Sequence, residues 1–206
     1  MSVKGKFITF EGSEGCGKST QSKMLAQYLK RKGSRVLFVR EPGGTKICEQ
    51  IRKILLDPKN AHMSPVTEML LYMASRAQIV KEMIEPALLA GKIVISDRFL
   101  DSTIAYQGYG LGMDINLIKT VGESVTCGIK PNLTIFLDLA VKKGLRHRES
   151  GKDRIENRSI SFHQRVRNGY LKLAKKEPKR IKVVRVQKDK SLTQEKIREV
   201  IDKYVI

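Results

Sequence analysis

The chain has 206 residues, 41% of them hydrophobic, and a formal net charge of +19. This length predicts one domain with a self-sufficient core, and no apolar run is long enough to span a membrane, which argues against a membrane protein. Three scattered cysteines, and a strand-like N-terminus with no room for a secretory segment, favour a cytoplasmic chain with reduced thiols.

Short apolar runs alternate with helical patterns along the chain. Strands are predicted at residues 6–10, 35–40, 93–95, 133–137 and 181–186. Helices are predicted at 18–31, 45–56, 65–89, 114–127 and 161–176 and after Ser191, with N-caps at Thr45, Asp114 and Ser191 and a kink or break near Pro86. This alternation predicts a single α/β domain over residues 1–206, with a five-stranded parallel sheet covered by helices on both faces.

The loops that follow the strands of such a sheet open on one edge, where ligands bind. They are predicted at residues 11–20, 41–45, 97–107, 138–156 and 187–190. The loop at 97–107 begins with an adjacent acid and base, Asp97 and Arg98, and is rich in hydroxyl, amide and aromatic side chains. This edge is therefore the predicted functional site.

Residues 12–19, GSEGCGKS, match the phosphate-binding pattern G-x-x-x-x-G-K-[ST] between a predicted strand and a predicted helix. Glycines let the backbone amides wrap a phosphate, Lys18 brings a charge to the β- and γ-phosphates, and Ser19 can ligate Mg²⁺. Cys16 is interpreted as a small space-filler. The predicted ATP-binding residues are Gly12, Ser13, Glu14, Gly15, Cys16, Gly17, Lys18, Ser19 and Thr20.

Asp97 ends an apolar strand, where P-loop enzymes place a carboxylate that orients Mg²⁺ or its waters. Asp97 and Ser19 are therefore the predicted metal ligands. Asp97 has a second interpretation that the sequence leaves equally open, as a helix N-cap or as the ion-pair partner of the adjacent Arg98.

Five stretches, in this order, resemble the thymidylate kinase family of P-loop nucleoside-monophosphate kinases: FEGSEGCGKST, REPGGT, EMLLYMASRAQ, SDRFLDSTIAYQG and DRIE. The resemblance covers nearly the whole chain. It implies a three-layer P-loop kinase fold with a short lid at about residues 142–156. It also implies that a homodimer transfers the γ-phosphoryl group of ATP to dTMP with Mg²⁺, giving dTDP for dTTP and DNA synthesis.

The resemblance implies which residues hold the phosphate and the base of dTMP. Arg98 and Arg52 would bind the phosphate, Tyr72 would stack on thymine, and Arg76 would contact the pyrimidine edge. The family often has Asp just before this last arginine, and Ser75 stands there instead, which weakens any inferred salt bridge. The alternatives are a solvated helix face for Arg52 and a core position for Tyr72.

The resemblance gives four more residues a place around the acceptor. Thr103 and Gln107 would form hydrogen bonds around the base. Tyr106 would wall the sugar where a 2′-OH would sit. Glu14, in the phosphate loop, would approach the 3′-OH side of the acceptor, with solvent exposure on a tight loop as the alternative.

The phosphate loop has no basic residue at positions 13–16, so the resemblance implies that a lid arginine meets the charge on the transferring phosphoryl group. At least one Arg→Ala change in the lid is expected to lower kcat by about 10³-fold or more. A solvated charged helix is the alternative. The predicted catalytic residues are Lys18, Arg98, Glu14 and the lid arginines Arg146, Arg148 and Arg154, with Arg148 preferred because it is the last arginine before the glycine turn. His147 and His163 are expected to be solvated.

Two other functions remain open. One is a kinase for another nucleoside or nucleotide, although a ribonucleotide would need space that Tyr106 fills. The other is a nucleic-acid-binding P-loop ATPase, which the charge of +19 would suit. The basic residues form local clusters without a Gly- or Ser-rich basic tail, so nucleic acid is not the expected partner. The helix at 65–89 could supply a dimer face, although amphipathicity usually indicates core.

Overall fold

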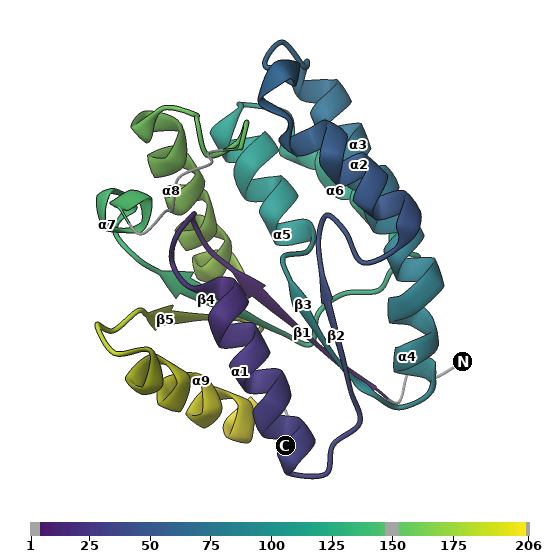
Figure 1. Cartoon of the computed structure of the whole chain (residues 1–206), viewed down its shortest axis with the longest axis vertical. Helices are drawn as coiled ribbons and strands as arrows, with labels where there is room; N and C mark the ends of the chain where they lie inside the picture. Colours follow the sequence, from purple (N-terminus) through teal and green to yellow (C-terminus); the bar gives the residue numbers. More distant parts are fainter. Residues whose placement is uncertain (1–4, 147–152, 205–206) are drawn as a thin grey trace.

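The computed structural model describes residues 5–146 and 153–204. At its centre lies a sheet of five strands: β1 (Lys6–Glu11), β2 (Val36–Arg40), β3 (Ile93–Asp97), β4 (Leu133–Asp138) and β5 (Ile181–Arg185). The strands run parallel in the order β2-β3-β1-β4-β5, as Figure 1 shows. The predicted five-stranded parallel sheet is therefore confirmed.

One face of the sheet is covered by α1 (Lys18–Arg31) and α9 (Lys190–Tyr204), which pack side by side (Figure 1). Ile8 and Phe10 of β1 point to this face and share an apolar cluster with Leu25 of α1. They are two residues apart, the spacing that places side chains on one face of a strand. Ile8 and Phe10 therefore bury this face of β1 against α1.

The opposite face is covered by a larger group of helices. α2 (Lys46–Leu56) packs on α3 (Pro65–Ile79), which packs on α6 (Ile115–Val125), and α8 (Ile160–Lys176) packs on β4 and β5. Phe7 of β1 points to this side. The molecule therefore has three layers, as the predicted kinase fold requires.

The long helix predicted at residues 65–89 is divided into three pieces. α3 ends at Ile79, a π-helical turn η2 follows at Val80–Ile84, and α4 is Glu85–Leu89. Pro86 lies in the first turn of α4, and it has no N–H to donate to the preceding turn. The predicted break near Pro86 is confirmed.

The loop predicted at residues 97–107 is wrong, because most of it is helical. After Arg98, which has a left-handed φ of 74°, come the short helix α5 (Leu100–Thr103) and a π-helical segment η3 (Ile104–Gly110). The polar side chains Asp101, Ser102, Thr103 and Gln107 are buried. Because this helical segment buries polar side chains, its sequence lacks the apolar stripe that usually identifies a helix. Its many polar residues therefore led to the prediction of a loop.

Helix caps follow the sequence with one exception. Thr45 and Asp114 accept hydrogen bonds from the first turns of α2 and α6, as predicted. Ser191 was expected to cap the last helix, but Asp189 holds that position and accepts from the Ser191 amide at 2.7 Å. A carboxylate at the start of a helix is a good acceptor and complements the helix dipole. In the described parts of the chain, none of the helices combines the length and the apolar character needed to cross a membrane.

Candidate active site

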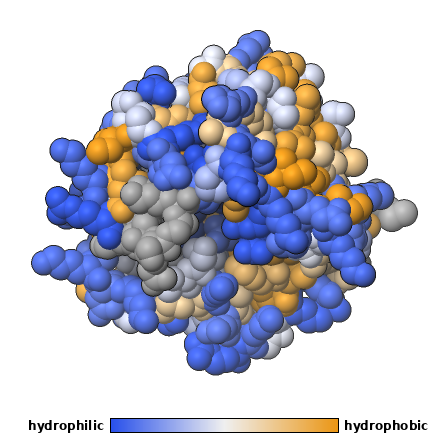
Figure 2. Space-filling model, turned by 45° about the horizontal axis from the view of Figure 1, so that its top comes forward, coloured by the Kyte–Doolittle hydropathy of each residue, from blue (hydrophilic) through white to orange (hydrophobic). Residues whose placement is uncertain are grey.

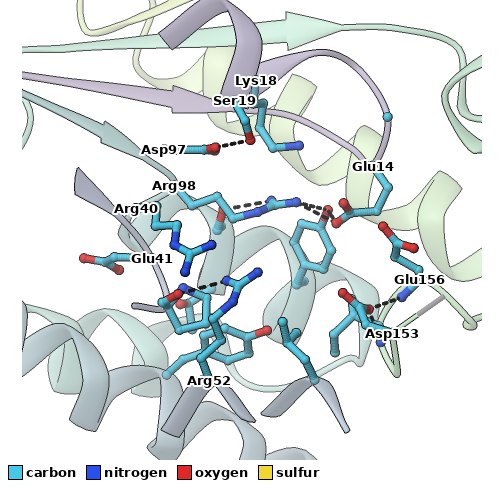
Figure 3. Close-up of a pocket in the computed structure, with 18 of the residues that line it drawn as sticks. Glu14, Lys18, Ser19, Arg40, Glu41, Arg52, Asp97, Arg98, Asp153 and Glu156 are labelled. Carbon is cyan, nitrogen blue, oxygen red and sulfur yellow. Dashed lines mark hydrogen bonds and ion pairs between the residues drawn. The ribbon is translucent and has the colours of Figure 1, made fainter. Parts of the chain in front are cut away.

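A cavity of about 540 Å³ lies beyond the carboxyl ends of β1, β2 and β3, the edge predicted to bind ligands. Figure 3 shows side chains from these three strand ends and from the surrounding helices pointing into it. It brings together most of the predicted site residues: Glu14, Gly15, Gly17, Lys18, Ser19, Thr20, Arg52, Tyr72, Asp97, Arg98, Thr103, Tyr106 and Gln107. Of the other predicted loop residues, Ser13 and Cys16 are buried beneath the surface, and Cys16 fills space in the apolar cluster.

The phosphate loop packs closely against α7 (Val141–Arg146). Gly15 has a left-handed φ of 69°, and a Cβ atom there would meet the carbonyl oxygen of Gly144 at 2.0 Å. Only glycine satisfies both conditions. Lys18 opens α1, and its ammonium group donates to the carbonyl oxygen of Ser13 at 2.8 Å, which holds the charge across the loop.

Ser19 and Asp97 meet where α1 begins and β3 ends. The Ser19 hydroxyl donates to Oδ2 of Asp97, and both side chains line the cavity (Figure 3). Both offer oxygen, the ligand atom that Mg²⁺ prefers. The alternatives for Asp97 do not hold, because the Arg98 guanidinium pairs with Glu14 and Phe99 occupies the N-cap position of the next helix.

Arg98 is the centre of a hydrogen-bonded group under the phosphate loop. Its Nη2 atom lies 2.6 Å from Oε1 of Glu14 and 3.1 Å from the Tyr106 hydroxyl oxygen, and Nη1 donates to Ser102 at 3.2 Å. The Tyr106 hydroxyl in turn donates to Glu14 at 2.7 Å. Burial alone would raise the pKa of Glu14, but the charges of Arg98 and Lys18 lower it to about 2. Arg98, Glu14 and Tyr106 therefore hold one another in place.

Glu11, the last residue of β1, fixes the backbone that carries Arg98. Its carboxylate accepts hydrogen bonds from the Phe99 amide at 2.8 Å, the Ser102 hydroxyl at 2.5 Å and the Tyr170 hydroxyl at 2.8 Å. Burial, with the nearby charge of Asp101, raises the pKa of Glu11 to about 7. The sequence analysis missed this residue, although it lies within FEGSEG.

Arg52 and Tyr72 face the cavity, so the solvated position considered for Arg52 is wrong. Arg52 is half-buried on α2 and donates to the carbonyl oxygen of Pro42 at 2.9 Å. Burial lowers the pKa of Arg52, as does the neighbouring charge of Arg40. Burial raises the pKa of the Tyr72 hydroxyl. Figure 3 shows the guanidinium groups of Arg40, Arg52 and Arg98 pointing into one region of the cavity.

Arg76 lies behind the cavity wall, and among the described residues it is not part of the lining. It is 1% exposed, with Nε 2.9 Å from Oε2 of Glu41 and Nη1 donating to Thr103 at 3.0 Å. Here Arg76 contacts Thr103, which lines the cavity, and its contact with the pyrimidine edge stays a prediction. Arg76 thus finds its ion-pair partner in Glu41, from the loop after β2, and not in an acid at position 75, where Ser75 stands. Burial raises the pKa of the Glu41 carboxyl group to about 7, although the charge of Arg76 acts in the opposite direction.

Arg154, one of the three lid arginines predicted to meet the transferring phosphoryl group, is also buried in this structure. Its Nη1 atom lies 2.6 Å from Oε2 of Glu68, and Nε donates to the carbonyl oxygen of Leu55 at 2.9 Å. Two nitrogen atoms of this guanidinium are therefore engaged by buried acceptors in this structure. Arg146 is exposed at the end of α7, while Arg148 and His147 lie outside the described residues.

Two further corrections concern a histidine that was expected to be solvated and cavity residues that were not predicted. His163 was expected to be solvated but is buried on α8, where its ring packs edge-on to Phe162. The cavity lining also includes Arg40, Glu41, Pro42, Asp153 and Glu156, which were not predicted as site residues. They lie in REPGGT and DRIE, two of the stretches on which the family resemblance rests. REPGGT begins with Arg40, the last residue of β2, at the ligand-binding edge of the sheet.

Three comparisons with known proteins agree. A family model described as thymidylate kinase matches residues 10–197. The chain is 48% identical over 204 residues to a thymidylate kinase of Thermoanaerobacter sp., covering 98% of this chain and all of the relative. It is 53% identical over 189 residues to a thymidylate kinase of Geotalea daltonii, covering 87% and 88%. The crystal structure of thymidylate kinase from Ehrlichia chaffeensis superposes with a TM-score of 0.80 at 36% identity, covering 96% of this chain and 98% of that one.

Proposed function

The chain belongs to the thymidylate kinase family, and from this premise we propose that it phosphorylates dTMP to dTDP with ATP and Mg²⁺ in the cavity described above. The observation that carries the proposal is the charge arrangement of that cavity. Lys18 belongs to the phosphate loop, and Arg40, Arg52 and Arg98, from the ends of β2 and β3 and from α2, line the same cavity. Two anionic substrates repel each other, so a phosphoryl-transfer site needs cations that hold both.

The transfer needs positioning more than covalent chemistry. The backbone amides of the phosphate loop and Lys18 would hold the β- and γ-phosphates of ATP. Arg98 and Arg52 would hold the dTMP phosphate, whose oxygen forms a bond to the γ-phosphorus while the bond to the bridging β,γ-oxygen breaks. A guanidinium suits this task because its forked N–H groups match phosphate oxygens.

Ser19 and Asp97 are the residues that would hold Mg²⁺. Their hydroxyl and carboxylate oxygens already lie in contact and line the cavity, which fits a cation that takes few protein ligands and shares substrate phosphates. The bound cation would neutralise charge on the β- and γ-phosphates.

Two tyrosines support an acceptor with a pyrimidine base and a deoxyribose. Tyr72 offers a flat ring at the cavity wall for stacking, an interaction worth about 1–3 kcal/mol. Tyr106 is 5% exposed and its hydroxyl is held by Arg98 and Glu14, so its ring cannot move aside for a 2′-OH. We assign the base contacts to Thr103 and Gln107.

We further propose that residues 1–206 form one domain with a lid at about residues 142–156. Because Arg154 is held by Glu68, the arginine that meets the transferring charge would be Arg146 or Arg148. The contact between Gly15 and Gly144 links the phosphate loop to the helix that leads into this segment. A lid that joins the loop in this way can close over ATP and exclude water.

A homodimer is the proposed assembly. α2, α3 and α6 pack side by side and expose five large apolar side chains, each 46–51% accessible: Ile47, Ile54, Val66, Leu70 and Leu117. In Figure 2, apolar residues gather on the side where Figure 1 places α2 and α3. Such a patch on a surface with this much charge is typical of an interface. The three cysteines are unpaired, which supports a cytoplasmic location for the enzyme.

The direct test is a panel of nucleoside monophosphates with ATP and Mg²⁺, scored for ADP release, with the Lys18→Ala variant as the control. We expect dTMP to be the best acceptor. A different best acceptor would support another nucleotide kinase. ADP release that depends on single-stranded DNA, and falls steeply with salt, would support a nucleic-acid-dependent ATPase instead.

A further inference from the structure

Glu68, on α3, is a fully buried carboxylate that joins the acceptor site to two arginines, one at the end of the proposed lid and one just after it. Its Oε1 atom accepts a hydrogen bond from Nε2 of Gln107 at 2.7 Å. Its Oε2 atom lies 2.6 Å from Arg154 and 2.6 Å from Arg158. The two oxygens thus have separate partners, a neutral amide on one side and two guanidinium groups on the other.

The contact with Glu68 determines which way the Gln107 amide faces. A carboxylate paired with two arginines offers only acceptor atoms, so the group that Gln107 turns toward it must be the NH₂. The carbonyl oxygen Oε1 then points to the other side of the amide plane. Because Gln107 lines the cavity, this side chain presents an acceptor to a bound base.

We propose that Glu68 is a positioning residue for base selection, which fixes the Gln107 amide so that its carbonyl oxygen accepts the N3–H of the acceptor base. This inference rests on the proposed function of the cavity. Thymine and uracil carry a proton on N3, whereas cytosine has a lone pair there. A fixed carbonyl oxygen attracts the first two bases and repels the third, and a mismatched pair of buried acceptors is costly.

The two oxygens of Glu68 supply a matched pair of variants. Glu68→Gln places an amide beside Gln107 that can donate as well as accept, so the Gln107 amide is free to turn over. Arg158→Gln removes one cation from Oε2 and leaves the contact between Oε1 and Gln107 intact. Loss of a structural ion pair affects both variants, and loss of amide orientation affects only the first.

The experiment measures kcat/KM for dTMP and dUMP, and the inhibition constant of dCMP against dTMP. In Glu68→Gln we expect the preference for dTMP over dCMP to fall by about tenfold or more, since one hydrogen bond is at stake. The ratio of dTMP to dUMP should stay within about twofold, because both bases carry N3–H. In Arg158→Gln both ratios should stay within about threefold of wild type.

A swapped double variant, Glu68→Gln with Gln107→Glu, distinguishes orientation from packing. There the amide at position 68 donates to the carboxylate at position 107, whose second oxygen again faces the cavity as an acceptor, so the dTMP preference should return. If Glu68→Gln does not fold, Glu68→Asp, which keeps the charge but is one methylene shorter, is expected to lose the preference in the same way. An unchanged dTMP-to-dCMP preference in the folded variant overturns the inference. A wild-type protein that does not phosphorylate dTMP overturns the proposed function instead.

Discussion

The two sides of the cavity are built in different ways. The phosphate loop is one continuous segment, residues 12–19, and its shape comes from backbone conformation and from glycines where a side chain would collide. The acceptor side takes its side chains from α2, α3, α5, η3 and the residue after β3. Several of them are held through buried carboxylates on other elements: Glu11 fixes the backbone beside Arg98, Glu41 holds Arg76, which contacts Thr103, and Glu68 holds Gln107. A short stretch of sequence can therefore specify a site that binds phosphate through backbone amides. Recognition of a base needs side chains whose positions depend on residues far away in the sequence.

The largest effect is expected from the donor side. Lys18→Ala should abolish turnover, a loss of about 10³-fold or more, because it removes charge stabilisation of the transferring phosphoryl group. Packing should change little, since the Lys18 ammonium contacts the carbonyl oxygen of Ser13 and the sulfur of Cys16, both within the phosphate loop. Steady-state kinetics and circular dichroism would check both statements. A folded variant with near-normal kcat would remove the phosphate-loop assignment.

Arg154 and Arg146 allow a comparison of a buried and an exposed arginine within the proposed lid. Arg154→Ala should destabilise the fold by about 3–5 kcal/mol, because it leaves the buried Glu68 with one cation fewer and Leu55 without its donor. Arg146→Ala should change the free energy of unfolding by less than about 0.5 kcal/mol, since the side chain is exposed. Urea unfolding of both variants measures the difference. Equal stabilities would show that the ion pair with Glu68 does not stabilise the native state.

Arg98→Lys probes the acceptor side directly. An ammonium cannot reproduce the fork that reaches Glu14, Tyr106 and Ser102, so kcat/KM for dTMP should fall by about 10²-fold. The matched control is Arg185→Lys at the exposed end of β5, which should leave kcat/KM within about twofold. If both substitutions have the same small effect, the forked contact is not needed to hold the dTMP phosphate.

The sequence predicted the phosphate loop and the carboxylate beside it for a physical reason. The pattern GSEGCGKS carries its own geometry, and the apolar strand before Asp97 placed that carboxylate beside Ser19, as the structure confirms. The roles of the acceptor residue Arg76 and of the lid residue Arg154 came only from the family resemblance, because nothing near them in the sequence indicates the carboxylates that hold them. Glu41 lies 35 residues from Arg76, and Glu68 contacts Arg158 across 90 positions. Contacts over such separations depend on how the helices pack, and no local pattern encodes them.

The pH dependence of stability tests the buried carboxylates. The folded-state pKa of Glu11 is about 7, above its ordinary value of 4.5, so the folded protein binds more protons than the unfolded chain between these two pH values. Glu11 therefore lowers stability as pH rises through this window. From pH 5 to 7.5, the stability of Glu11→Gln should rise relative to wild type by more than about 1 kcal/mol, since one pKa unit corresponds to about 1.4 kcal/mol. Urea unfolding at both pH values measures this change, and parallel pH profiles would contradict it.

The smallest effect concerns the methyl group of the base. dUMP should be phosphorylated less well than dTMP, by an amount that corresponds to about 1 kcal/mol, because one buried methyl group is worth roughly 0.8 kcal/mol. UMP and CMP should be far poorer acceptors, because their 2′-OH would press on the buried ring of Tyr106. Values of kcat/KM for the four nucleotides provide the check. Comparable values for UMP and dTMP would show that Tyr106 does not exclude the hydroxyl.

The separation of the two sides is the central claim, and the affinity of Lys18→Ala for dTMP tests it most directly. Isothermal titration of dTMP into this variant, without ATP, measures the acceptor side alone. Because Arg52, Arg98 and Tyr72 are untouched, the Kd for dTMP should stay within about threefold of the wild-type value while turnover is lost. A loss of dTMP affinity that parallels the loss of turnover would mean that Lys18 holds the acceptor, and the division of the cavity into donor and acceptor sides would be wrong.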